Sequence, residues 1–237
     1  MPPDSLDLYA NGSALSALLR RELAMLTSVL EGVYGVWGLH MRPHGNAPGV
    51  LPNHLLSEVI NLALRPDGSL DGAARCEPAH LPFASESFKL VIAQHTLEQA
   101  AQPQESAAEF ARVIAPEGVG LVFGFNPVSL WRPWLSRRLP ADCQFRSAAA
   151  WREELSRARL DVLQVRYAGP WSPRSAFSES LDDQKEQGQR SFGRFGASWL
   201  VLARKRRHTL TPLRLAAVRS DLKLKPTLAP GARRECA

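Results

Sequence analysis

The chain has 237 residues, a formal net charge of +6, 45% hydrophobic residues and 22% charged residues. These fractions exclude a disordered or fibrous chain, and the length suits one domain with short appendages. No run approaches the roughly 20 apolar residues of a membrane span, and the N-terminus lacks the pattern of a signal peptide. Cys76, Cys143 and Cys236 lie far apart without a CxxC pair. We therefore expect a cytoplasmic protein without a disulfide framework or a zinc knuckle.

The positive charge is concentrated at the C-terminal end. Residues 204–237 contain ten Lys or Arg and two acidic residues, whereas residues 1–203 contain 19 basic and 21 acidic residues. The charge of the body therefore gives no reason to expect a nucleic-acid-binding domain. Residues 207–237 are expected to form a flexible basic tail. This tail is either a solvated extension or an arm for RNA, DNA or anionic lipid, whose binding would weaken steeply with salt.

The N-terminal region predicts a helix over residues 14–29. Leucines recur at helical spacing from Leu15 to Leu30, and Ser13 is the expected cap. Such a leucine stripe is typical of a packing face. Residues 1–32 are therefore expected to form a helical cap.

Two strands and a loop are expected after this helix. Residues 36–41 form an apolar, β-branched and aromatic run, and residues 57–64 form a second run closed by the turn RPDGS. Residues 46–52 must be a loop, because they contain two prolines and a glycine. A third short strand is expected near residues 74–77.

A β-α-β unit follows. Residues 89–94 and 118–125 are continuous apolar runs, as expected of strands that are covered on both faces. Pro103 begins a helix between them, and Pro116 and Gly118 are expected to end it. The crossover should be right-handed and its two strands parallel.

The C-terminal part predicts a helix and two strands. The helix covers residues 147–160, with Ser147 as its cap, and the strands cover residues 161–169 and 197–204. A long polar connection at residues 170–195 joins the two strands. We expect them to pair antiparallel at the edge of an otherwise parallel sheet.

Four short motifs follow one another between residue 81 and residue 118, across the first strand and the helix of the β-α-β unit. They are Leu81-Pro82-Phe83, Phe88-Lys89-Leu90-Val91, His95-Thr96-Leu97-Glu98 and Arg112-Val113-Ile114-Ala115-Pro116-Glu117-Gly118. Together they resemble the cofactor domain of class I methyltransferases of the type-11 branch. The resemblance implies an α/β fold, a Rossmann-like, doubly wound, mostly parallel seven-stranded sheet with a C-terminal antiparallel hairpin. It also implies S-adenosyl-L-methionine as the cofactor.

Two further segments narrow the resemblance. Residues 125–131 and 202–206 are similar to a bacterial subfamily of predicted methyltransferases with a degenerate glycine loop. The resemblance covers roughly residues 15–210, and the methyltransferase-like domain is expected to span residues 33–206.

The chain departs from the family at the first strand and its loop. The family has an acidic residue and a Gly-x-Gly-x-Gly turn there, and glycines let the backbone approach the cofactor. Residues 38–45 read GLHMRPHG instead, and Arg42 could repel the sulfonium or meet the cofactor's carboxylate. The acid expected to hold the ribose is also missing. Asn61 is a neutral substitute, and Asp67 and Asp71 are expected to lie too far along the chain.

The resemblance assigns site residues to the ends of the parallel strands. The residues expected to contact the cofactor are His40 and Gly45 at its methionine part, Asn61 at its ribose, His80 and Leu81 at its adenine, and Gln94 and His95 at its methyl group. His95 is the candidate general base, because the pKa of histidine lies near 6.5. The alternatives are a hydrogen bond from His95 to the backbone at the strand end and a solvent-facing loop position for His80.

The acceptor is expected to be a small molecule. Phe125, Trp131 and Trp134 would either wall its pocket or pack in the core. No metal site is expected, because Pro43 and Gly45 break the helix that would bring His40 and His44 together. The alternative functions are a non-catalytic, methyltransferase-like binding protein and an RNA methyltransferase anchored by the basic tail. The sequence indicates no membrane span and does not define the oligomeric state.

Overall fold

A computed structural model gives the fold of most of the chain. It describes residues 8–9, 13–140, 143–170, 172–173, 176 and 195–206. The basic tail at residues 207–237 and most of the connection at residues 170–195 lie outside the described residues.

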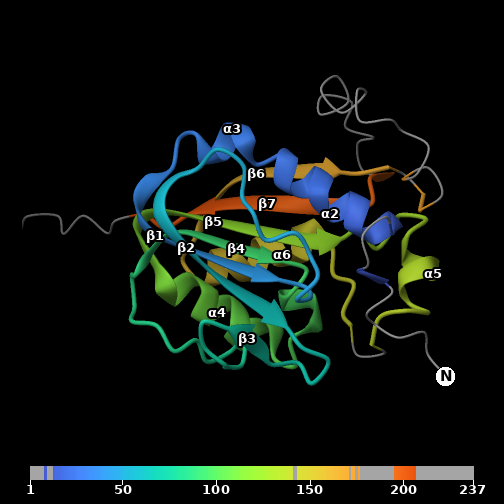
Figure 1. Cartoon of the computed structure of the whole chain (residues 1–237), viewed down its shortest axis with the longest axis horizontal. Helices are drawn as coiled ribbons and strands as arrows, with labels where there is room; N and C mark the ends of the chain where they lie inside the picture. The colour runs from blue at the N-terminus through green and yellow to red at the C-terminus, as the bar shows by residue number, and fades with distance from the viewer. Residues whose placement is uncertain are drawn as a thin grey trace, which may run out of the picture. The chain divides into compact units, whose positions relative to one another are not determined.

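Seven strands form one mixed sheet in the order β3-β2-β1-β4-β5-β7-β6. Strands β2, β1, β4 and β5 pair in parallel, whereas β7 runs antiparallel to both β5 and β6. The predicted Rossmann-like sheet with its C-terminal antiparallel hairpin is thus confirmed, with β6 at the edge (Figure 1). The strands are β1 (Tyr34–Arg42), β2 (Leu55–Leu64), β3 (Leu70–Gly72), β4 (Phe88–Gln94), β5 (Ile114–Phe125), β6 (Asp161–Ala168) and β7 (Ser198–Arg204).

Helices cover both faces of the sheet. In β4, Val91 and Ala93 join the core under α4 and α6, and Leu90 and Ile92 join the core under α2 and α3. This alternation is the period of a strand buried on both faces. The helices are α2 (Ala14–Ala24), α3 (Thr27–Leu30), α4 (Pro103–Val113), α5 (Arg132–Leu135) and α6 (Ala148–Arg157), and the 3-10 turn η1 (Leu97–Gln99) follows β4.

The N-terminal helix is shorter than predicted. Ser13 caps α2 as expected, accepting the N–H of Ser16 at 3.1 Å. The helix ends at Ala24: the Leu26 N–H bonds to the Leu23 carbonyl, the Thr27 hydroxyl donates to the Ala24 carbonyl at 2.9 Å, and a separate short helix, α3, begins at Thr27. The continuous helix over residues 14–29 is therefore wrong, although the leucine stripe is buried as predicted.

The third strand lies earlier than predicted. After the turn at residues 65–69, β3 folds back antiparallel on β2, with Leu70 opposite Leu64. Cys76 forms only an isolated bridge with Leu70, so residues 74–77 are not a strand. Leu70 is fully buried and anchors this hairpin in the core.

The crossover from β1 to β2 contains no helix. Residues 43–54, all of them described, form a loop, although most parallel crossovers include a helix. Arg42 supports the loop from inside: its Nη1 donates to the Ala47 carbonyl at 2.9 Å and to the Gly45 carbonyl at 3.3 Å. A loop at residues 43–54, whose carbonyls accept hydrogen bonds from Arg42, thus stands where a β-α-β crossover ordinarily has a helix.

In the described part of the chain, no helix is both long and apolar enough to cross a membrane.

Candidate functional site

A cavity of about 670 Å³ opens where the parallel strands end. It lies at the carboxyl ends of β1 and β2 and beside the turn after β4, which is where open α/β sheets bind ligands. Its volume is within the range of about 300–1,000 Å³ usual for small-molecule sites. The lining residues are Leu8, Tyr9, Pro43, His44, residues 64–69, residues 75–79, residues 99–102, Ser106 and residues 138–140.

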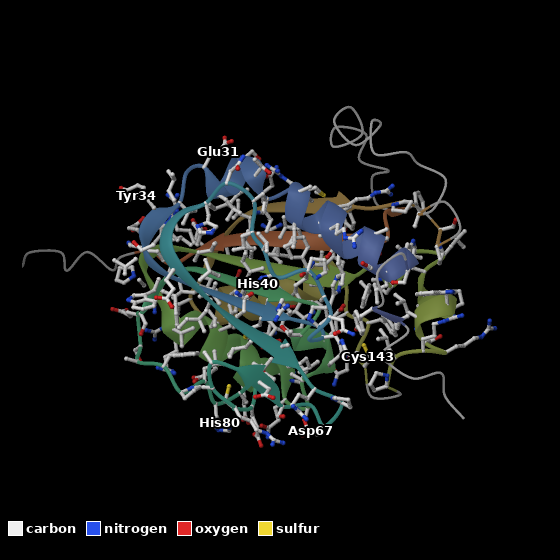
Figure 2. All side chains as sticks on the ribbon, viewed as in Figure 1. Glu31, Tyr34, His40, Asp67, His80 and Cys143 are labelled. Carbon is white, nitrogen blue, oxygen red and sulfur yellow. The ribbon has the colours of Figure 1, made fainter. Side chains whose placement is uncertain are left out.

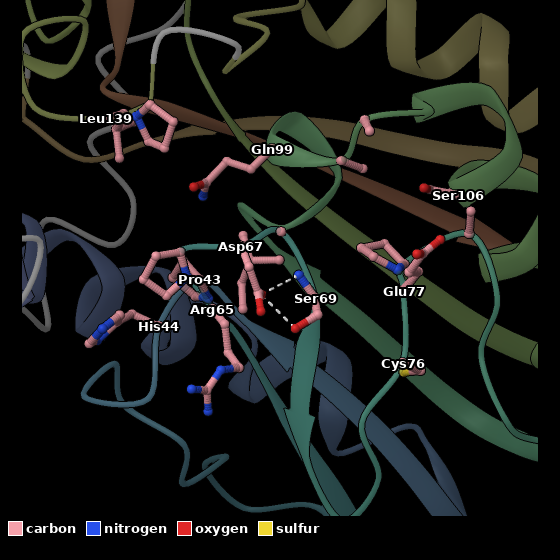
Figure 3. Close-up of a pocket in the computed structure, with 18 of the residues that line it drawn as sticks. Pro43, His44, Arg65, Asp67, Ser69, Cys76, Glu77, Gln99, Ser106 and Leu139 are labelled. Atoms are coloured by element: carbon pink, nitrogen blue, oxygen red, sulfur yellow. Dashed lines mark hydrogen bonds between the residues drawn. The ribbon is translucent and has the colours of Figure 1, made fainter.

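Two carboxylates line this cavity. Figure 3 shows Asp67 and Ser69 in its middle, with Glu77 and Ser106 at one end and His44 and Leu139 toward the other. The Asp67 carboxylate accepts the Ser69 N–H at 3.0 Å and the Ser69 hydroxyl at 2.6 Å, and it pairs with Arg75 at 2.8 Å. These hydrogen bonds, and then Arg75, lower the pKa of Asp67, so the carboxylate is ionised at neutral pH.

The opposite end of the cavity is built from the N-terminal segment and the loop after β1. Tyr9 is only 4% exposed, and its ring stacks on His44 with centroids 4.9 Å apart and an interplanar angle of 7°. Burial raises the pKa of Tyr9, so its hydroxyl keeps its proton. Gln99, from the turn after β4, also lines the cavity, and its side-chain amide donates to the His95 carbonyl at 2.9 Å. This end therefore combines an aromatic pair with amide and hydroxyl groups.

His95 lies in a buried network rather than in the cavity. Its Nε2 is 2.9 Å from Oε1 of Glu22 on α2, and its Nδ1 is 3.3 Å from Oε2 of Glu98. All three side chains are at most 1% exposed. Gln94 donates to Glu22 at 2.9 Å, and the His95 ring stacks on Phe125. The network fastens the N-terminal helix to the carboxyl ends of β4 and β5.

The charge state of His95 follows from these carboxylates. Burial alone would lower the pKa of His95, but Glu22 and Glu98 outweigh burial and raise it to about 9. The ring is therefore an imidazolium at neutral pH, with both nitrogens occupied. A general base must be unprotonated and within reach of the substrate. This geometry does not suit the role of base that the sequence predicts. It favours a structural role, although the partners of the ring are carboxylates and not the backbone.

His40, Asn61 and Gln94 lie on the face of the sheet that α2 covers. His40 pairs in register with Asn61 of β2 and Ile92 of β4, and Figure 2 shows it within the fold. Burial, and then Arg42, lower the pKa of His40 to about 4, so its ring is neutral. None of the three lines the cavity. The structure brings them together with each other but not with the cavity.

The remaining predicted residues lie beside the cavity but do not line it. Gly45 is exposed next to His44, and Arg42 donates to its carbonyl. The His80 side chain is 73% exposed, and its Nδ1 is 3.5 Å from Glu77. Leu81 is 5% exposed, and its N–H donates to Glu109 at 2.8 Å. Each of these positions remains a prediction as a cofactor contact.

The sequence reasoning missed Asp67, Glu77 and His44. Asp67 was expected to lie too far along the chain to hold the ribose, but the turn after β2 folds back and brings it to the cavity, whereas Asp71, which pairs with Arg65, does not line the cavity. Glu77 stands four residues before the LPF loop, and an acid in that place was an available signal. His44 gave a weaker signal, because only the loop's path brings it to the cavity.

The aromatic cluster after β5 is mainly core. Phe125 and Trp131 are at most 1% exposed, and Trp134 packs against the same cluster. None of these three residues lines the cavity. The described residues contain no group of three His, Cys, Asp or Glu side chains placed to hold a metal ion.

The buried network predicts a pH-dependent stability. His95 has a folded pKa of about 9, whereas an unfolded histidine titrates near 6.5, so its stabilisation is complete below about pH 6.5 and is lost as the pH rises through 9. We expect the difference in unfolding free energy between the wild type and His95→Gln to shrink by about 3 kcal/mol between pH 6 and pH 10. Urea denaturation across this range measures it, with the exposed His80→Gln as the control. A difference that stays constant with pH would contradict the charged network.

Three comparisons with known proteins agree with this fold. Residues 53–122 match the model of the family described as "Methyltransferase domain", type 11. The match runs from the residues just before β2 into β5 and leaves out β1 and most of the crossover. This part of the chain is thus similar to type-11 methyltransferase domains.

The chain is also similar to the Escherichia coli protein YafS. The two are 25% identical over 212 residues, with 85% of this chain and 82% of YafS covered. A Haloferax volcanii protein described as a methyltransferase was solved in complex with the activator Trm112. It has a TM-score of 0.59 and 15% identity, covering 87% of this chain and 100% of that chain. An S-adenosylmethionine-dependent methyltransferase from Mesorhizobium loti has a TM-score of 0.52 and 14% identity, covering 82% and 99%.

Proposed function

We propose that the protein is an S-adenosylmethionine-dependent methyltransferase that modifies a small molecule. The observation that carries the proposal is the cavity at the carboxyl ends of β1 and β2, which is lined by the carboxylates of Asp67 and Glu77. A methyltransferase domain supplies the family context. Both the cofactor in this cavity and the nature of the acceptor belong to the proposal.

The chemistry of the lining residues fits an adenosyl ligand. Glu77, at one end, can accept a hydrogen bond from the exocyclic amine of adenine, and Asp67, in the middle, can accept from ribose hydroxyls (Figure 3). Asp67 keeps its charge because Ser69 and Arg75 stabilise the carboxylate. S-adenosylmethionine would supply an activated methyl group on its sulfonium ion.

The chain's own contribution to catalysis would be positioning and exclusion of water. Leu8, Leu139 and Pro140 give the end near His44 an apolar lining, and Tyr9 and Gln99 add polar groups beside it. A fixed, poorly hydrated acceptor reacts faster because the cost of orientation is met on binding. No dedicated base is needed for an acceptor that is already nucleophilic. A structural role for His95 is therefore compatible with this reaction class.

Calorimetry tests the proposal at the level of the cofactor. The full chain should bind S-adenosylmethionine and S-adenosylhomocysteine saturably, in the micromolar to millimolar range usual for enzyme ligands, roughly 1 μM to 1 mM. NAD, which shares the adenosine but lacks the amino-acid end, should bind more weakly. Absence of saturable heat with either adenosyl ligand, or tighter binding of NAD, would overturn the proposal and favour a non-catalytic scaffold.

Labelling tests the acceptor class. Incubation with methyl-labelled S-adenosylmethionine and a bacterial extract should move the label into the small-molecule fraction. Label recovered in RNA would instead support the alternative of an RNA methyltransferase anchored by the basic tail. A protein that binds the cofactor but transfers no label to any fraction would contradict the enzyme proposal.

A further inference from the structure

The loop after β1 offers no helix N-terminus to a ligand. Such a terminus ordinarily presents free backbone N–H groups to an anion. Residues 43–54 contain no helix, and Arg42 is held by the carbonyls of Gly45 and Ala47 and is not among the residues that line the cavity. An anionic group at this end of the cavity must therefore find a different donor.

His44 is the polar side chain that this loop contributes to the cavity. Its Nδ1 accepts the N–H of Asn46 at 3.2 Å. Burial, and then the charge of Arg42, lower the pKa of His44, so the ring is neutral at pH 7. In a neutral ring whose Nδ1 accepts a hydrogen bond, the proton is on Nε2. His44 is consequently a hydrogen-bond donor to the site and not a base.

The ring of His44 is also held in place. It stacks nearly parallel on Tyr9, which is buried, and its Nδ1 is tied to the backbone. A donor fixed before binding loses little side-chain freedom when a ligand arrives. Figure 3 shows His44 at the end of the cavity away from Glu77 and Ser106. A ligand whose nucleoside lies at Glu77 and Asp67 would extend its other end toward His44.

We propose that the Nε2–H of His44 binds the carboxylate at the amino-acid end of the adenosyl ligand, in place of backbone amides. This inference rests on the proposed function, since Glu77 and Asp67 must hold the nucleoside. The proposed contact explains how the cavity can bind the carboxylate although the loop after β1 has neither a glycine-rich turn nor a helix. Tyr9 then serves as the surface against which the donor is oriented.

Two ligands separate this subsite from the nucleoside site. S-adenosylhomocysteine carries the amino-acid end, whereas 5′-methylthioadenosine lacks it. In calorimetry with the full chain, the wild type should bind S-adenosylhomocysteine more tightly. His44→Phe keeps a ring to stack on Tyr9 but removes the donor. It should weaken S-adenosylhomocysteine about 10-fold or more, as expected for a hydrogen bond to a charged group, and leave 5′-methylthioadenosine unchanged.

His54→Phe is the matched control. His54 lies in the same loop, and its Nδ1 accepts the N–H of Leu56 at 3.4 Å, but it does not line the cavity. It should leave both affinities unchanged. If His44→Phe weakens both ligands equally, or neither, the carboxylate subsite is overturned and the proposed function stands. If the wild type binds neither ligand, the proposed function fails, and the subsite fails with it.

Discussion

Replacing His95 with glutamine is expected to lower the free energy of unfolding by about 3–5 kcal/mol at pH 7. The change removes the only cation between Glu22 and Glu98 in the network, and both carboxylates are buried. A buried charge that loses its partner bears the full cost of its desolvation. Urea denaturation followed by circular dichroism measures the loss. The companion variant Glu22→Ala should also destabilise, because it removes the carboxylate that pairs with both Gln94 and His95.

His80→Gln is the control for this experiment. His80 is also a histidine predicted for the site, but its side chain is 73% exposed, so its replacement should change stability by less than about 0.5 kcal/mol. If His95→Gln is as stable as His80→Gln and cofactor affinity falls instead, His95 acts in the cavity and the structural role is wrong.

Neutralising Asp67 or Glu77 is expected to weaken S-adenosylhomocysteine about 10-fold or more for each residue. Each carboxylate would lose a charged hydrogen bond to the nucleoside. The substitutions Asp67→Asn and Glu77→Gln preserve size, and asparagine can still accept the Ser69 N–H that Asp67 accepts now. Titration calorimetry at constant salt measures both affinities.

Asp71→Asn is the matched control for the two carboxylates. Asp71 is close in sequence and pairs with Arg65 at 2.6 Å, but it does not line the cavity. Its neutralisation should leave the affinity within about twofold, which corresponds to about 0.4 kcal/mol. An equal loss in all three variants would mean that the effect comes from net charge rather than from the site.

The sequence predicts most of the sheet because burial leaves a regular pattern. The apolar run of β4 and the Ser147 cap of α6 are local signals, and both are confirmed. The break between α2 and α3 depends on the local turn at residues 25–26, and the place of β3 depends on how a turn folds back on β2. These details are decided by contacts that hydrophobic periodicity does not encode.

The candidate site is harder to predict for a similar reason. His40, Gln94 and His95 lie at strand ends, where either a ligand or a neighbouring helix can meet a polar side chain. Here α2 contacts two of them, because its Glu22 side chain hydrogen-bonds to both Gln94 and His95. Glu22 is 72 and 73 positions away from these two residues in sequence. Only the fold reveals that pairing. Most of the residues that line the cavity come instead from turns and loops beyond the strands.

A crystal structure of the chain with S-adenosylhomocysteine would test the central claim most directly. Electron density for the adenine is expected beside Glu77, with the ribose hydroxyls at Asp67 and the amino-acid end toward His44. A nucleoside bound among Glu22, His40 and His95 beneath α2, or a cavity left empty at saturating ligand, would contradict this assignment of the cofactor site.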